Sequence, residues 1–325
     1  MMTRLGSAVF PNPVMTASGC AAAGRELNQF FDVADLGAVV TKSIMTRPRS
    51  GRPTPRMAET PSGMLNSIGL QGPGIDSFIE NDLAWLAEHG ARTVVSIAGG
   101  HTDEYVELAR KLYGNPAVSM IEVNISCPNV ESRGQVFACD VIASSRVISS
   151  VRRAADPRQP IFAKLSPDVT DIALIARACA DAGADGFSLI NTLLGLVIDT
   201  ETMAPALGGI TGGLSGPAIR PVAVRAVWQV KKALPHLPIL GMGGIRTGLD
   251  ALEFILAGAS AVSVGTAVFG DPNAPMRVLA ELEAALDERG FASLADAIGY
   301  AHLDEHQRAA RRIVRDSVAA GERAV

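Results

Sequence analysis

The sequence predicts an α/β protein whose eight parallel strands, each followed by a helical segment, close into a barrel. Of its 325 residues 48% are hydrophobic, which is enough for two ordinary domains or for one large barrel. Short apolar runs recur along the chain, and they are almost continuously apolar, as is typical of parallel strands covered on both faces. Helical patterns lie between these runs. Eight such units within about 250–270 residues describe a (β/α)8 TIM barrel.

Eight runs rich in valine and isoleucine are the expected strands. They cover residues 14–19, 38–44, 93–99, 120–127, 161–166, 186–192, 238–244 and 261–267. An open, doubly wound sheet is the structural alternative. It is disfavoured because no strand followed by a GxGxxG turn and a helix occurs early in the chain.

Residues 76–90 and 171–186 show the helical period clearly. The apolar residues that recur at helical spacing are Phe78, Leu83 and Leu86 in the first segment and Ile172, Ile175 and Cys179 in the second. The second segment ends in glycine, which is typical of a helix C-terminus. These patterns predict helices with one face against the barrel.

Three connections are too long to be simple turns, namely residues 45–75, 128–140 and 193–216, which follow the second, fourth and sixth strands. Long loops in compact domains usually carry function. We expect all three to emerge at the carboxyl face of the barrel, where active sites of this fold lie. The chain is predicted to form a single barrel domain over residues 1–325, with a solvated helical tail from about residue 293.

Composition and charge exclude several classes of function. The net charge is −4 and the pI is near 5.8, so neither nucleic acid nor an anionic membrane is an expected partner. The sequence predicts no signal peptide and no membrane span. Its four cysteines are scattered without metal-ligand spacing, so no zinc or iron–sulfur site is expected on this chain. A cytoplasmic location is the corresponding prediction.

The expected strand ends carry polar side chains that would meet at one mouth. In chain order they are Ser18, Lys42, Ser43, Ser96, Asn124, Cys127, Lys164, Asn191, Thr192, Gly243, Gly244, Gly265 and Thr266. A single strand-end lysine is as often a side chain that reaches to solvent as a ligand. However, two of only five lysines in the chain stand at these ends. Lysine supplies a compact charge that can point at one acceptor.

The glycine pairs after the seventh and eighth strands predict a phosphate site. Backbone without Cβ can approach an anion closely and direct N–H groups at it. The loops after these two strands often form a phosphate site in barrels. A phosphate here, together with two lysines and several amides, indicates a phosphorylated flat cofactor, for which flavin mononucleotide (FMN) is the natural candidate.

Cys127 stands in the stretch NISCPN, where Pro128 ends the strand. A lone cysteine after a strand is most often a small buried hydrophobic residue. At the barrel mouth its thiol could instead be a nucleophile or a general base. None of the five histidines lies at an expected strand end, which favours proton abstraction over acyl transfer. Asparagine amides nearby would suit the alternating donors and acceptors of a pyrimidine ring.

These motifs resemble the dihydroorotate dehydrogenase family. The resemblance covers about residues 5–290, and its motifs occur in the family's order: ASGC, TKS, GRPTPR, MLNSIGLQGPG, NISCPN, KLSPDVTD, INTLLG, TGGLSGPAI, GMGGI and SVGTA. Cys127 resembles the soluble class 1 enzymes, since the membrane-associated class has serine there. ASGC, LNSIGLQ, KLSP and TGGLSGPAI look like class 1B, which passes electrons to NAD through a partner subunit.

The resemblance implies a reaction and a role for each matching residue. Dihydroorotate would be oxidised to orotate in de novo pyrimidine (UMP) biosynthesis, with Cys127 taking the C5 proton and FMN, one per chain, the hydride from C6. A loop over residues 128–140 would close over the ring. The residues implied to hold the substrate are Lys42, Asn66, Ser67, Ile68, Gly69, Leu70, Asn124, Asn191 and Thr192. Those implied to contact the cofactor are Ser18, Lys42, Ser43, Ser96, Asn124, Lys164, Ile190, Gly216, Gly243, Gly244, Gly265 and Thr266.

Two positions depart from the family pattern. Ser96 stands where class 1B chains usually have asparagine, and serine there looks more like class 1A, the fumarate-using type. Arg52, in GRPTPR, replaces the usual asparagine in a turn that would anchor the loop after the second strand. A stand-alone, fumarate-reducing enzyme is therefore the main alternative.

The resemblance also implies partners. It implies a homodimer and an electron-transfer subunit that carries FAD and a [2Fe-2S] cluster, neither of which would be held by this chain. No metal is expected on the chain itself. A flavin-binding barrel without catalysis is the less favoured alternative from a different class, because Cys127 and both strand-end lysines are present.

Overall fold

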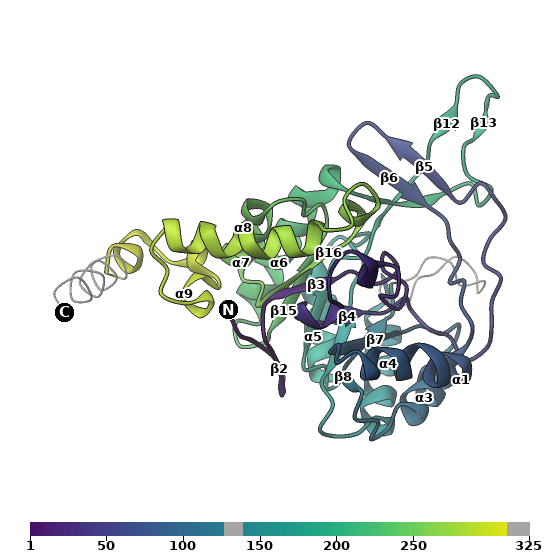
Figure 1. Ribbon diagram of the computed structural model, residues 1–325, viewed down its shortest axis with the longest axis horizontal. Helices are drawn as coiled ribbons and strands as arrows, with labels where there is room; N and C mark the ends of the chain where they lie inside the picture. The colour runs from purple at the N-terminus through teal and green to yellow at the C-terminus, as the bar shows by residue number, and fades with distance from the viewer. Residues whose placement is uncertain (127–138, 311–325) are drawn as a thin grey trace.

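Eight strands form one parallel sheet that closes into a barrel. The computed structural model of the chain describes residues 1–126 and 139–310 (Figure 1). The strands are β3 (Val14–Thr16), β4 (Val39–Val40), β7 (Thr93–Ile97), β8 (Val118–Asn124), β9 (Ile161–Lys164), β10 (Gly186–Leu189), β15 (Ile239–Met242) and β16 (Ala261–Val264), in the spatial order β3-β16-β15-β10-β9-β8-β7-β4. A parallel bridge between Met15 and Ala38 joins the first and last members. The eight expected strands and the barrel are confirmed.

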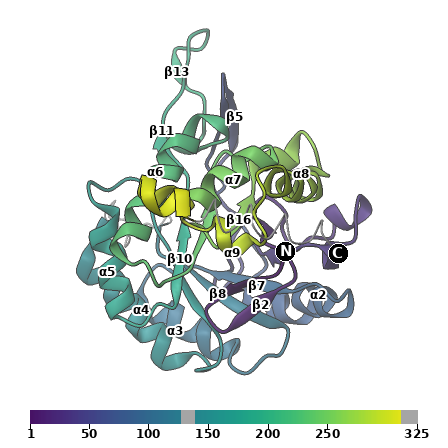
Figure 2. The same cartoon turned by 90° about the vertical axis from the view of Figure 1, so that its left-hand side faces the viewer.

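Helices cover the outside of the barrel (Figure 2). They are α1 (Ile75–Ser77), the π-helix η3 (Phe78–Leu83), α2 (Ala84–Glu88), α3 (Thr102–Lys111), α4 (Val141–Ala154), α5 (Ile172–Asp181), α6 (Arg220–Ala233), α7 (Gly248–Ala257) and α8 (Ala274–Glu288). The helix predicted over 76–90 is the continuous run α1–η3–α2, whose Phe78, Leu83 and Leu86 are buried. The helix predicted over 171–186 is α5, which begins where the Asp171 side chain accepts hydrogen bonds from Ala173 and Leu174.

The first connection of the barrel departs from the expected pattern. Between β3 and β4 the chain forms two 3-10 helices, η1 (Leu27–Gln29) and η2 (Val33–Asp35), where an α-helix was expected. Ala22 and Gly24 have φ angles of 45° and 86°, and this left-handed backbone cannot belong to a right-handed helix. The first unit of the predicted barrel therefore contains 3-10 helices in place of an α-helix.

The barrel interior changes from apolar to polar along the strands. Every second residue of β8, namely Met120, Glu122 and Asn124, faces the barrel interior. Phe162 and Lys164 of β9 do the same. At the amino ends, a core of inward side chains includes Met120 and Phe162, and the N-terminal hairpin of β1 (Thr3–Leu5) and β2 (Ala8–Phe10) packs against it. At the carboxyl ends the same register brings polar side chains into the mouth.

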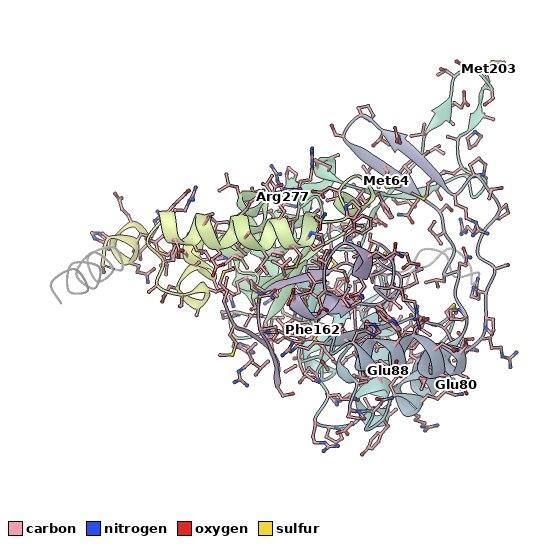
Figure 3. The ribbon with its side chains drawn as sticks, viewed as in Figure 1. Met64, Glu80, Glu88, Phe162, Met203 and Arg277 are labelled. Carbon is pink, nitrogen blue, oxygen red and sulfur yellow. The ribbon has the colours of Figure 1, made fainter. Side chains whose placement is uncertain are left out.

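The long loops after β4 and β10 pair with each other above the mouth. They contain β5 (Met57–Thr60), β6 (Gly63–Asn66), β11 (Leu193–Gly195) and β14 (Gly212–Ser215), which form an antiparallel sheet in the order β11-β14-β6-β5. A further hairpin, β12 (Ile198–Asp199) with β13 (Ala204–Pro205), extends beyond this sheet, and Figure 3 shows Met203 at its tip. The sequence predicted long loops here but not their pairing. Of the predicted connection over residues 128–140, residues 128–138 lie outside the described residues.

The segment after α8 is partly helical. It contains α9 (Leu294–Ala297), the 3-10 helix η7 (Tyr300–His302) and helical residues 305–310, which are exposed. The ring of His302 stacks on that of Trp228 in α6, with 3.7 Å between the centroids. Across the described part of the chain, no helix is long and apolar enough to cross a membrane.

Candidate active site

Two adjoining cavities open at the carboxyl mouth of the barrel. The first has a volume of about 550 Å³ and the second about 490 Å³. Residues predicted for the site that line the first are Ser18, Lys42, Ser43, Asn66, Ile68, Gly69, Leu70, Asn124, Asn191, Thr192 and Thr266. Those that line the second are Ser18, Lys164, Ile190, Asn191, Thr192, Gly216, Gly243, Gly244, Gly265 and Thr266. The two lists share Ser18, Asn191, Thr192 and Thr266, so the cavities form one connected site.

Three of the predicted residues are not among these lining residues. Ser67 is 1% exposed and lies behind the first cavity, where it accepts a hydrogen bond from Arg52. Ser96 is fully buried behind Ser43, with 2.9 Å between the two Oγ atoms. Cys127 lies outside the described residues.

The strand-end asparagines are held by hydrogen bonds to one serine. Ser126 Oγ donates to Asn124 Oδ1 at 2.9 Å, and Asn191 Nδ2 donates to Ser126 Oγ at 2.8 Å. Asn191 Oδ1 also accepts from the backbone N–H of Thr192. These contacts fix which end of each amide is the donor and which is the acceptor. Two oriented amides at the wall of one cavity can recognise a ring with alternating N–H and C=O groups.

The predicted glycine cradle is present in the second cavity. Gly243 and Gly244 follow β15 with φ angles of 129° and 78°, which residues other than glycine rarely adopt. A Cβ on Gly244 would lie 2.7 Å from the carbonyl oxygen of Gly216. The Ser263 hydroxyl on the same cavity wall is buried and has no hydrogen-bond partner among the described residues. Close backbone and an unsatisfied hydroxyl fit a bound phosphate.

Basic side chains line both cavities, together with Glu26 and Asp82 in the first and Asp271 in the second. The Lys164 side chain is 4% exposed, and its Nζ donates to Ser18 Oγ at 2.8 Å. Lys42 lines the first cavity, and Arg246 and Arg277 line the outer part of the second. Arg277 is itself paired with Asp271 and Glu281, at 2.8 and 3.0 Å. The arrangement suits an anionic ligand in each cavity.

Cys20 is a site residue that the sequence analysis missed. It lines both cavities, two positions after Ser18 in the motif ASGC, and this closeness to a strand end was the available signal. Burial raises the pKa of its thiol to about 11, although the nearby Lys164 and Lys42 act to lower it. This shift favours the protonated thiol of Cys20 at neutral pH.

Glu122 was also missed. It is fully buried on β8, two residues before Asn124 and on the same face of the strand. Its Oε1 atom accepts a hydrogen bond from Ser96 Oγ at 2.9 Å and forms an ion pair with Lys164 Nζ at 3.5 Å. The signal was a single acidic residue inside an otherwise apolar strand, because charged residues are almost never fully buried without a partner.

Arg52 joins the loops that wall the first cavity. Its backbone N–H donates to the carbonyl of Ile68 at 3.0 Å, and its Nη1 donates to the carbonyl of Gly209 at 3.3 Å. The side chain itself lines the cavity. Arg52 thus connects the segment around residues 66–70 with the loop after β10.

The described side chains at the mouth are mainly neutral donors and acceptors with basic groups among them. Within residues 1–126 and 139–310, no group of three or more histidine, cysteine, aspartate or glutamate side chains could hold a metal ion. The site offers amides, hydroxyls, two lysines and a glycine cradle. This set suits the binding of a planar anionic substrate beside a phosphorylated cofactor.

Comparison with known proteins identifies a family. Residues 1–286 match the family described as Dihydroorotate dehydrogenase. A protein of Pelobacter propionicus named "Dihydroorotate dehydrogenase B (NAD(+)), catalytic subunit" is 50% identical over 299 residues, which are 92% of this chain and 97% of that protein. Proteins of the same name from Desulforudis audaxviator and Geobacter sulfurreducens are 51% and 49% identical, over 90% and 89% of this chain and 94% and 93% of theirs.

Proposed function

The chain belongs to the dihydroorotate dehydrogenase family, and on that basis we propose that it oxidises dihydroorotate to orotate in de novo pyrimidine biosynthesis. The observation that carries the proposal is the pair of connected cavities. One is walled by oriented amides and Lys42, which suit a pyrimidine ring and its carboxylate. The other is lined by a glycine cradle and Lys164, which suit a flavin phosphate and ring.

The proposed cofactor is FMN, one per chain. When bound, FMN supplies the hydride acceptor for the reaction. The residues proposed to hold it are Ser18, Lys42, Ser43, Asn124, Lys164, Ile190, Gly216, Gly243, Gly244, Gly265 and Thr266. Ser96 is proposed to act on the cofactor only through Ser43, because its hydroxyl lies behind that residue.

The substrate is proposed to lie in the first cavity. Its ring would be held by Asn66, Ile68, Gly69, Leu70, Asn124, Asn191 and Thr192, and its carboxylate by Lys42. Ser67 would support this wall from behind through Arg52. A lysine charge and oriented amides bind an anionic ring in one orientation, which keeps the C5 and C6 hydrogens in place for removal.

Cys127 is the proposed base that removes the proton from C5. The proposal rests on its place in the motif NISCPN, directly after the strand that ends at Asn124. Burial raises the pKa of Cys20, the described thiol that lines both cavities, which makes it the weaker candidate. A thiol near its ordinary pKa can take a proton without keeping a permanent negative charge beside the anionic product. The carbon–hydrogen bond at C6 breaks in the same oxidation, with its electron pair leaving as hydride.

The electrons are proposed to pass to NAD through a second subunit with FAD and a [2Fe-2S] cluster. The relatives are named as NAD-type catalytic subunits, and the described residues of this chain offer no metal cluster to carry electrons outward. A homodimer of the catalytic chain is part of the proposal. Ser96 was the residue that favoured the fumarate-using alternative, but relatives about 50% identical carry the NAD-type name.

Cofactor release and turnover assays test this proposal. Acid release of the flavin from the purified chain, followed by mass measurement, should recover FMN. The isolated chain with dihydroorotate should reduce neither NAD nor fumarate rapidly, and adding the electron-transfer subunit should produce NADH. Recovery of FAD would contradict the cofactor assignment. Fast fumarate reduction by the chain alone would instead replace NAD as the acceptor.

A further inference from the structure

Glu122 is an acidic residue whose side chain is fully enclosed by the barrel. Its Oε1 atom contacts Ser96 Oγ at 2.9 Å and Lys164 Nζ at 3.5 Å, and its Oε2 atom is buried without a hydrogen-bond partner among the described residues. Neither cavity is lined by Glu122, so it can act on a ligand only through its neighbours. A buried carboxylate is costly unless it is paired, which makes its position informative.

The contacts of Glu122 fix the direction of a chain of hydrogen bonds. Since a carboxylate only accepts, the single hydroxyl hydrogen of Ser96 points to Glu122. Ser43, 2.9 Å from Ser96, must then be the donor between the two hydroxyls. Asn124 Nδ2 donates to Ser43 Oγ at 2.9 Å, so the Asn124 oxygen faces Ser126. The carboxylate therefore sets the direction of the hydrogen bond between Ser43 and Ser96, and the Asn124 amide is additionally held by the backbone N–H of Ser126 at 3.3 Å.

The same carboxylate balances the charge of Lys164. The Lys164 side chain is 4% exposed, and Glu122 is the ion-pair partner of its ammonium group. In a poorly solvated interior, removal of one member of such a pair leaves the other charge uncompensated. Without the Glu122 carboxylate, the positive charge of Lys164 would stabilise a negatively charged flavin more strongly. A flavin gains negative charge when it is reduced or when sulfite adds to it.

We propose that Glu122 is a positioning residue that sets both the hydrogen-bond direction at Ser43 and the net charge that Lys164 presents to the cofactor. The proposal rests on the proposed function, because it requires a flavin in the second cavity. Ser96 transmits the effect of Glu122 on the hydrogen-bond direction, which gives a role to the residue noted as a departure from the class 1B pattern. Lys164 transmits its effect on the charge presented to the cofactor.

Two substitutions separate the two effects. Glu122→Gln removes the charge and keeps the shape, so the sulfite Kd should fall at least about tenfold, because a unit charge a few ångströms away in a protein interior contributes more than about 1.4 kcal/mol. For a two-electron couple a tenfold change corresponds to about 30 mV, and the flavin midpoint potential should rise by at least that amount. Ser96→Ala keeps the charge but interrupts the chain at Ser43, which lines the first cavity, so orotate should bind several-fold more weakly. Because the charge near the flavin is unchanged, the sulfite Kd should change much less than in Glu122→Gln.

Ser188→Ala is the matched control. Ser188 is also a fully buried serine of the barrel sheet, and its hydroxyl has no hydrogen-bond partner among the described residues. Its removal should change neither the sulfite Kd nor orotate binding. An unchanged sulfite Kd and potential in Glu122→Gln would overturn the charge role. Unchanged orotate binding in Ser96→Ala would overturn the orienting role.

If Glu122→Gln does not retain flavin, a double-mutant cycle of thermal stability tests the ion pair instead. Thermal unfolding of the purified Glu122→Gln, Lys164→Gln and doubly substituted chains should then show the double variant to be more stable than either single one, because no unpaired charge remains. Additive losses would reject the pairing. Failure of the proposed function is recognised separately. A wild-type chain that binds flavin but is not reduced by dihydroorotate would refute that function and leave the sulfite comparison valid.

Discussion

Arg52 Nη1 donates a hydrogen bond to the carbonyl oxygen of Gly209 at 3.3 Å, across 157 residues of sequence. This contact joins the loop after β4 to the loop after β10, and both loops contribute to the wall of the first cavity. Arg52 is the position where the sequence analysis noted a departure from the pattern of the family that the chain resembles. Its side chain therefore ties the two loops together.

Arg52→Ala should weaken orotate binding by about fivefold. A charged donor to a neutral acceptor contributes about 1 kcal/mol at a half-exposed position, and its loss leaves the two loops free to separate. Titration of the purified chain with orotate, followed by the flavin spectrum, measures the effect. Arg49→Ala is the control, since Arg49 is exposed in the same loop and does not line either cavity. Equal affinities in the two variants would contradict the role of Arg52.

Gly244→Ala should bind FMN at least about tenfold more weakly than wild type. The new Cβ would lie 2.7 Å from the Gly216 carbonyl oxygen and 2.9 Å from Arg220 Cβ, and the residue would keep a φ angle of 78° that costs about 1–3 kcal/mol. Gly270→Ala is the matched control on the same cavity rim, because a Cβ there meets no atom within 4 Å. FMN per chain after gel filtration gives the readout. Full retention of FMN by Gly244→Ala would count against the cradle.

Cys127→Ser should keep FMN and bind orotate but lose proton abstraction at neutral pH. A serine hydroxyl is a much weaker base, and a positioned general base contributes roughly 10²- to 10⁴-fold in rate. Stopped-flow reduction of the flavin by dihydroorotate measures this step. Cys139→Ser, which replaces an exposed thiol in the described part of the chain, should react at the wild-type rate. If Cys127→Ser also reacts at that rate, Cys127 is not the base.

The free energy of unfolding should fall as the pH rises above 9. Burial raises the pKa of the Cys179 thiol in α5 from 9.0 to about 12. Below pH 9 this thiol is protonated in both states and has no effect. Between pH 9 and 12 the unfolded chain loses the proton while the folded chain keeps it, which lowers stability by up to about 1.4 kcal/mol per pH unit.

Cys179→Ala should remove this contribution. Urea unfolding at several pH values between 8 and about 11 should show a shallower decline for the variant than for wild type. The difference between the two proteins should be constant below pH 9. Parallel declines above pH 9 would mean that Cys179 does not titrate as burial predicts. Cys20, whose pKa is raised to about 11, contributes to the decline that remains.

The barrel strands were predictable because their local sequence carries the signal. Buried parallel strands are apolar on both faces, so runs such as residues 161–166 stand out without any knowledge of their neighbours. The sheet above the mouth was not predictable in this way. Its β6 pairs with β14, and the partners of Leu65 and Asn66 are Leu214 and Gly213, far along the chain. No local pattern reports that pairing.

The site was predictable to the extent that it stands at strand ends. Lys42, Asn124 and Lys164 could be expected together because the carboxyl ends of parallel strands meet at one mouth. Residues in the loops, such as Asn66, were found only through the family resemblance. Glu122 was missed because its meaning depends on Ser96 and Lys164, which come from the strands on either side of β8.

The most direct test of the central claim is anaerobic mixing of the purified wild-type chain with dihydroorotate, while the visible absorbance of its flavin is recorded. We predict that the flavin is reduced without any partner subunit and that one orotate forms for each FMN. Because this half-reaction needs only the two connected cavities and the proposed base, no acceptor can mask the result. A chain that carries FMN but stays oxidised in excess dihydroorotate would contradict the account.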